Sequence, residues 1–113
     1  MPDYPLTPED LIAGASVIYD VPIPPEILRP GGDNGHAASP MIIQLRPLTI
    51  GTFQLIMKAS RQDASLIPLL MIKEALVQPK LSLEQVKQLH LGFVNYLLTH
   101  IREISGLSEK KSP

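Results

Sequence analysis

The sequence predicts an α+β fold that is mostly α-helical: a small bundle of three to four helices with a short N-terminal β-hairpin. Two observations lead to this prediction. Nine of the 12 prolines lie at or before Pro47, and proline fixes φ and lacks an N–H, which excludes long helices from that half. The apolar residues recur at period two in that half, and at a helical period from Thr49 onward.

The N-terminal half contains two candidate strands. In SVIYDVPIPPEIL, the residues at 17, 19, 21 and 23 are apolar at period two, which is typical of a strand. Pro22 and Pro24 point the other way and cannot donate to a ladder, so this strand is expected at a sheet edge. MIIQLRP predicts the second strand, and RPGGDNGHAASP between them predicts a mobile loop. We expect an antiparallel pair that packs on the helices.

Thr49 is expected to cap the first long helix, with Ile50, Phe53, Ile56 and Met57 on one face. The hydroxyl of a threonine at this position satisfies a free amide of the first helical turn.

The segment DASLIPLLMIKEALVQP predicts a second helix that begins after Asp63 or Ser65. A cap at Ser65 places Pro68 in the first turn, where its missing N–H is harmless. Apolar residues surround almost the whole circumference, which is typical of the buried centre of a bundle. Pro79 is expected to end the helix.

Two further helices are expected near the C-terminus. The S-x-x-Q spacing at Ser82 is that of a capping box, so a short third helix should start at Leu83. Gly92 makes one continuous helix less favourable by about 1 kcal/mol relative to Ala. A last helix is expected to run to about Ser105, with Gly106 in the left-handed position that often follows a helix.

The predicted organisation has three parts. Residues 1–40 form a Pro/Gly-rich arm with an edge strand and a mobile loop, residues 41–107 form a helical domain, and residues 108–113 form a frayed polar tail.

The composition excludes several classes of protein. The net charge is −1, from 10 basic and 11 acidic residues, so nothing indicates a polyanionic partner. Cysteine is absent, which excludes disulfides and thiolate metal sites. The N-terminus lacks the features of a signal peptide, and the longest apolar run is too short to span a bilayer. We therefore expect a cytoplasmic protein with no membrane, metal or cofactor.

The residues also give no indication of catalysis. The histidines at 36, 90 and 100 form neither an H-x-x-x-H nor an H-E-x-x-H pattern. The serines lack the glycines of a nucleophile elbow, and the glycines at 31, 32 and 35 are not followed by the Lys-Ser/Thr of a phosphate loop. The chain is not expected to be an enzyme.

Binding to DNA is one remaining interpretation. The run LEQVKQLHLGFVNYLLTHI has the outline of a helix-turn-helix, with a short helix, a glycine turn and a second helix. Lys87 is the only Lys or Arg in this run, and Arg102 follows it directly, which is few cations for a ligand whose affinity depends on Lys and Arg.

Binding to a protein partner is the other interpretation. A bundle this small cannot be expected to cover every side of an apolar helix, and exposed apolar patches mark interaction sites. The Pro-rich arm is a second candidate, because extended segments often become ordered on a partner. Whether the chain also binds copies of itself stays open. The predicted contact residues are Met57, Ile67, Met71, Ile72 and Leu107.

Three segments together resemble a known family. IQLRPLTIGTFQLIMKA, LIPLLMIKEALVQPKLSLEQVKQL and VNYLLTHIREISGL resemble the tail assembly chaperones of tailed phages and related contractile injection systems. The similar parts are Ile43–Thr49, Leu66–Pro79, Leu81–Leu89 and Val94–Leu107, so the resemblance covers about the last two thirds of the chain. Its motifs are apolar spacings and caps, and the Pro-rich arm is an addition to the family pattern.

The resemblance implies a helical, non-enzymatic protein that binds the tape-measure protein, or another tail component, before the tail tube polymerises. Such a chaperone covers an apolar amphipathic segment until assembly displaces the cover. Two alternatives are kept: a small structural or adaptor subunit of a phage tail or contractile injection particle, and a helix-turn-helix DNA-binding regulator.

Overall fold

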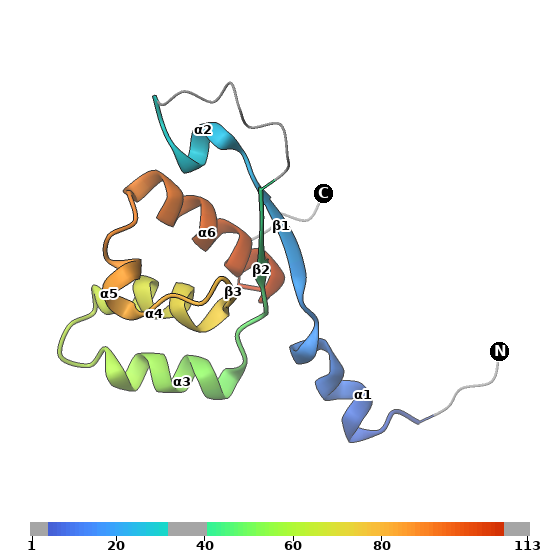
Figure 1. The fold of residues 1–113 in the computed structure, drawn as a ribbon. Helices are drawn as coiled ribbons and strands as arrows, with labels where there is room; N and C mark the ends of the chain where they lie inside the picture. The colour runs from blue at the N-terminus through green and yellow to red at the C-terminus, as the bar shows by residue number, and fades with distance from the viewer. Residues whose placement is uncertain (1–4, 32–40, 108–113) are drawn as a thin grey trace, which may run out of the picture.

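A computed structural model describes residues 5–31 and 41–107 of the 113-residue chain. The predicted α+β class is confirmed: helices pack on one face of a small antiparallel sheet (Figure 1). The elements in chain order are α1 (Pro8–Ile12), η1 (Ala13–Ser16), β1 (Tyr19–Ile23), α2 (Pro25–Leu28), β2 (Met41–Leu45), α3 (Ile50–Ala59), α4 (Leu66–Ala75), β3 (Leu76–Gln78), α5 (Leu83–Val86) and α6 (Leu91–Ile104).

The predicted hairpin is present. β1 pairs antiparallel with β2, in a register that places Val21 opposite Ile43. β1 is an edge strand, as its prolines predict, because the sheet order is β1-β2-β3. Val21 and Ile23 are buried, whereas Tyr19 is exposed, so only one end of the strand packs on the helices.

The third strand corrects one prediction. The second helix was expected to run to Pro79, but α4 ends at Ala75 and residues 76–78 form β3. A residue before proline is biased away from the helical region, so the chain is already extended at Gln78. β3 then pairs with β2, and the N–H of Arg46 donates to the carbonyl of Ala75 at 2.9 Å. The apolar residues of this segment therefore belong first to a helix, up to Ala75, and then to a strand.

α4 is the centre of the bundle, as its apolar circumference predicts. It packs against α3, α5 and α6, and it buries Met71, Ile72 and Ala75. α6 contributes Leu97, Leu98 and Ile101 to the same core. The helices therefore share one hydrophobic core with β1 and β2.

The helix caps follow the sequence closely. Thr49 Oγ1 accepts the N–H of Thr52 at 3.1 Å, and Ser82 forms the predicted capping box. Gly106 has φ +75°, in the left-handed position expected after a helix. The N–H of Leu107, the next residue, donates to the carbonyl of Arg102 at 2.7 Å and closes the end of α6. Ser65 is the first residue before α4, but its hydroxyl makes no cap and instead lies 2.6 Å from Asp63 Oδ1.

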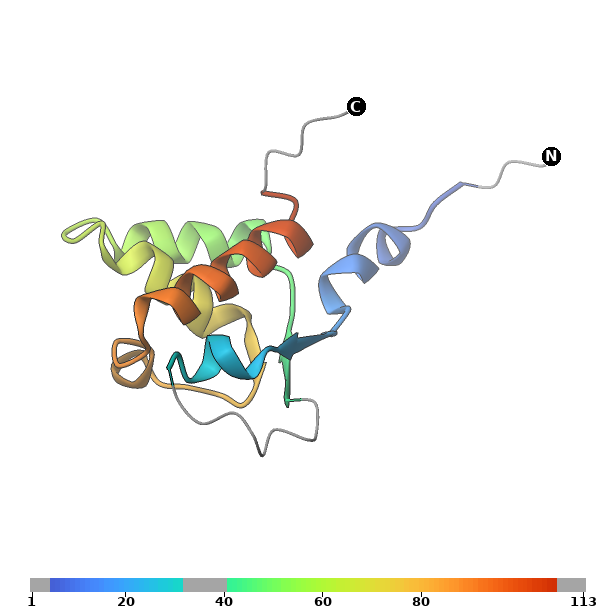
Figure 2. The same cartoon turned by 90° about the horizontal axis from the view of Figure 1, so that it is seen from above.

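The predicted domain boundary at residue 40 does not separate two bodies. β1 and α2 pack with the helical domain, because the sheet pairs across that boundary and Ile27 and Leu28 border the core. Of the described residues, only 5–18, hereafter the arm, extend away from it (Figures 1 and 2). Residues 32–40 of the predicted loop RPGGDNGHAASP, with His36, and the predicted tail at 108–113 lie outside the described residues.

Candidate functional site

The arm exposes apolar side chains that nothing in the described part of the chain covers. None of the five residues of α1 is buried. Leu11 is 71% exposed and Ile12 is 65% exposed, and Leu6 and Ile18 are also exposed. A short helix with uncovered apolar residues gains little stability by itself, because most helical stability comes from packing of an apolar face. These residues are therefore available for contact.

The start of the arm helix is nevertheless well defined. Thr7 Oγ1 accepts the N–H of Asp10 at 3.1 Å, and Asp10 Oδ2 accepts the N–H of Thr7 at 2.9 Å. This is a capping box, with Pro8 in the first helical position. The hydrogen bonds from Thr7, first from its backbone N–H and then from its side chain, lower the pKa of Asp10 below its ordinary value.

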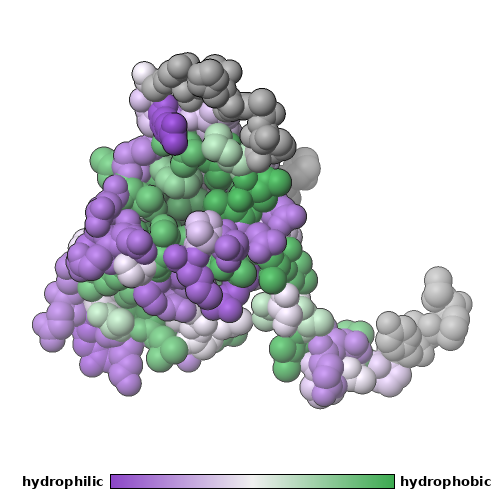
Figure 3. Space-filling view, in the orientation of Figure 1, coloured by the Kyte–Doolittle hydropathy of each residue, from purple (hydrophilic) through white to green (hydrophobic). Residues whose placement is uncertain are grey.

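A groove of about 700 Å³ lies between the arm and the body. We call it the arm groove. The arm contributes one side, and the β2–α3 connection with the start of α3 and the end of α6 contributes the other. In Figure 3, green surface lies at the point where the arm leaves the body and also on the arm itself. The lining residues are Leu11, Ile12, Gly14, Ala15, Tyr19, Pro47, Leu48, Thr49, Ile50, Gly51, Ile104 and Ser105.

A hydrogen bond between distant segments holds the body side of the arm groove in place. The backbone N–H of Leu48 donates to Ser105 Oγ at 2.9 Å. This bond ties the β2–α3 connection to the C-terminal end of α6, two segments that both line the groove. Ile50, the first residue of α3, is 80% exposed beside it.

A smaller apolar hollow of about 180 Å³ continues from the arm groove along α3. It shares Leu48, Thr49, Ile50 and Ser105 with the groove. Phe53, Gln54 and Leu107 complete its lining. Met57 lies seven positions after Ile50, which places it two turns further along the same face of the helix.

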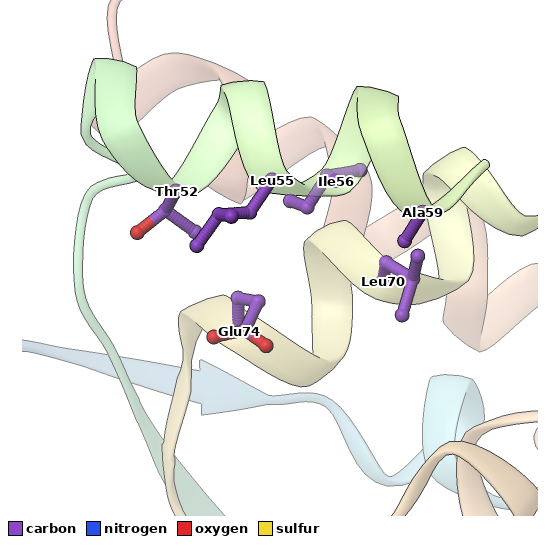
Figure 4. A pocket seen from close by; sticks show the side chains of 6 residues that line it. All are labelled: Thr52, Leu55, Ile56, Ala59, Leu70 and Glu74. Carbon is purple, nitrogen blue, oxygen red and sulfur yellow. The ribbon is translucent and has the colours of Figure 1, made fainter. Parts of the chain in front are cut away.

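A second, separate groove of about 170 Å³ lies between α3 and α4 (Figure 4). Leu55, which is 67% exposed, and Ile56 extend over it from α3, and Leu70 and Glu74 come from α4. Glu74 is paired with Lys73 at 3.6 Å. The arm groove is larger, and none of the described residues that line it is charged, so it is the stronger candidate for apolar binding.

The structure places two of the five predicted contact residues near this site. Leu107 lines the hollow, and Met57 is exposed two turns along α3 from Ile50. Ile67 is half-buried. Met71 is 5% exposed and Ile72 is 0% exposed, so these two belong to the core and cannot form part of a contact surface. They were misplaced because α3, α5 and α6 cover more of α4 than the length of the chain suggested.

Leu11, Ile12 and Ile50 are the important site residues that the sequence reasoning missed. A signal for the arm was present, because Thr7, Pro8 and Asp10 have the spacing of a capping box followed by two apolar residues. No sequence pattern, however, indicates that the end of α6 lies beside the start of α3.

The edges of the sheet are poorly suited to binding a further strand. On β1, Pro22 has no N–H, and its carbonyl accepts the hydroxyl of Tyr96 at 2.6 Å. β3 has only three residues and is followed by Pro79. Proline and very short strands are features that protect sheet edges from pairing. An occupant of the arm groove is thus expected to dock by its side chains.

No other kind of site stands out in the described residues. They contain no cluster of three or more His, Asp or Glu side chains that could hold a metal ion. Across the same residues, no helix is both long and apolar enough to cross a membrane. His90 and His100 lie in separate local contacts, beside Phe93 and Tyr96 respectively.

No protein-family model, curated protein or solved structure matches the chain.

Proposed function

We propose that the chain is a non-enzymatic assembly chaperone that covers an apolar helical segment of a tail or tape-measure protein. The observation that carries the proposal is the arm groove, which is open and apolar and which, among the described residues, no charged side chain lines. The resemblance of residues 43–107 to tail assembly chaperones supplies the class of partner. No catalytic step is part of the proposal.

The shape of the groove supports a helix as the partner. An amphipathic helix docks with apolar residues spaced three, four and seven positions apart, which follow a groove lined on both sides by apolar side chains. Here Leu11 and Ile12 form one side, and Ile50 with the hollow beside α3 forms the other. Side-chain docking of this kind is reversible, so later assembly can displace the chaperone.

A structural or adaptor role is the second candidate. The arm extends away from the body, as an element that links neighbouring subunits would (Figure 2). Purified particles separate the two roles: an adaptor remains in them, whereas a chaperone is absent. DNA binding has less support, because Arg102 is the only Lys or Arg of α6.

A matched pair of variants tests the proposal. Ile50 and Leu91 are each the first residue of a helix and each 80% exposed, but only Ile50 lines the groove. Leu91 lies at the opposite end of α6 from Ser105, roughly 20 Å away at 1.5 Å per residue. An aspartate at either position is compatible with the helix N-terminus, so I50D and L91D should be equally well folded.

The assay follows light scattering from a synthetic amphipathic peptide with a Leu/Ile stripe, which aggregates when alone. Wild type and L91D should suppress the aggregation. I50D should need about tenfold more protein, because burial of an isoleucine side chain is worth roughly 1.5–3 kcal/mol. Equal activity of I50D and wild type, or equal loss in both variants, would refute binding in the arm groove.

A further inference from the structure

A short hinge joins the arm to the body of the molecule. The two residues Val17 and Ile18 connect η1 to β1, and β1 is held by antiparallel pairing with β2. The arm points away from the body (Figure 2). A hinge this short gives the arm little freedom to fold back onto its own body, and short hinges favour exchange of an element between copies of a chain.

The arm carries apolar side chains that the described part of its own chain leaves exposed. α1 has five residues and buries none of them, and a helix this short is at best marginal by itself in water. The capped helix of the arm is therefore expected to be covered by another molecule. Five apolar side chains of the arm are 43–71% exposed, namely Leu6, Leu11, Ile12, Val17 and Ile18.

The area of these side chains decides between one docked arm and two. A Leu, Ile or Val side chain offers roughly 100 Å² of apolar surface, so the five together expose about 300 Å². Covering them with a similar area of a groove buries at most about 600 Å² of apolar surface, or about 1,000 Å² in total, since interfaces are roughly 60% apolar. A stable interface requires about 1,200–2,000 Å², so one arm in one groove is too little, whereas two exchanged arms bury about 2,000 Å².

The charges differ between the two sides of the arm groove. The arm contains Glu9 and Asp10 and no Lys or Arg. The body, over residues 41–107, has seven basic and four acidic residues, and Arg46 and Arg102 belong to the segments that form its side of the groove. These charges select neither a basic nor an acidic helix. An acidic part and a basic part on one surface are, however, complementary to a second copy of that surface turned about a twofold axis.

We propose that the occupant of the arm groove is the arm of a second copy, in a twofold dimer whose chains exchange their arms. α1 of each chain lies in the groove of the other, with Leu11 and Ile12 against Ile50 at the start of α3. This arrangement covers the apolar residues of both arms and places each acidic arm against a more basic body. A helix bound by the proposed function would displace the exchanged arm, but the dimer itself does not depend on that function.

The mass of the full chain in solution tests the dimer. Sedimentation over a range of concentrations should give twice the mass of the 12.4 kDa chain. L11A should weaken dimerisation about a hundredfold, because a twofold interface contains two copies of Leu11 and each contributes about tenfold. L91A should not weaken it, since Leu91 is exposed and does not line the groove. A monomer at every concentration, or equal effects of L11A and L91A, would overturn the proposal.

Disulfide trapping identifies the surfaces that meet. The chain has no cysteine, so a mixture of L11C and I50C chains can form the mixed disulfide only between two copies. Oxidation should trap this pair, and it should not trap L11C with L91C, although Leu91 is as exposed as Ile50. A dimer that traps neither pair, or both equally, is joined through another surface and contradicts arm exchange. A monomer that still suppresses peptide aggregation contradicts the exchange and leaves the proposed function intact.

Discussion

His90 joins the start of α6 to α2, because its Nε2 lies 2.7 Å from the carbonyl oxygen of Ile27, 63 positions earlier. The other ring nitrogen, Nδ1, accepts the N–H of Phe93 at 3.2 Å. A nitrogen that accepts carries no hydrogen, so the ring hydrogen is on Nε2, which donates to Ile27. One neutral imidazole thus caps a helix and holds a distant segment.

Replacing His90 should show both contributions. H90A removes the cap and the bond to Ile27, and we expect it to lower the free energy of unfolding by about 1–2 kcal/mol. H90N keeps a capping side chain that is too short to reach Ile27, so its loss should be smaller. Urea unfolding measures both variants. A stability of H90A equal to that of wild type would show that neither bond contributes.

Tyr96 gives a second prediction, for the protected edge of the sheet. Y96F keeps the ring and removes the hydroxyl that donates to Pro22 O, and we expect a loss of about 1 kcal/mol in urea unfolding. Y19F is the matched control, because Tyr19 lies at the exposed end of the same strand. A loss of the same size in Y19F would mean that the hydrogen bond at the edge is not the cause.

Ile72 gives a third prediction, which separates the core from the contact surface. I72A should cost about 2–5 kcal/mol of unfolding free energy, because it leaves a cavity at a fully buried position. I42A, at a position that is largely exposed, should cost much less. Chemical denaturation checks both. If I72A unfolds like I42A, position 72 is not part of a packed core.

Asp10 gives a prediction about pH. Hydrogen bonds from Thr7 lower its pKa in the folded arm below the ordinary value of 3.8. A lowered pKa means that the charged carboxylate stabilises the cap above pH 3.8 and that this support is lost as the pH falls through the folded pKa. NMR titration of the Asp10 carboxyl should therefore give a midpoint below 3.8 in wild type. The midpoint should rise in T7A. An unchanged midpoint in T7A would contradict the cap.

The local signals of the sequence predicted much of the fold. The caps at Thr49 and Ser82 and the position of Gly106 depend on a few neighbouring residues, and each is present where it was expected. Gly92 was interpreted as a break between two helices, but it lies in the first turn of α6. A Cβ there would lie 3.3 Å from Cε1 of His90, so the glycine leaves space for the capping ring.

The features that the sequence did not predict depend on contacts between distant residues. Leu76 and Val77 continue a helical apolar pattern, and only the pairing of their backbone with β2 makes them a strand. The candidate site is similar, because Ile12 and Ile50 come from segments that the hairpin brings together. Leu107 was predicted from its local apolar character, and it lines the hollow beside the groove. Met71 and Ile72 were misassigned for the same reason, since local character does not reveal burial.

The arm continues directly into β1, and this connection has a mechanical consequence. β1 is paired over five residues with β2, and its end is buried among the helices. A pull on the arm along the strand direction would therefore load all five pairs together in shear, and it would not peel them apart one at a time. Tension from whatever holds the arm would thus pass straight into the body of the molecule.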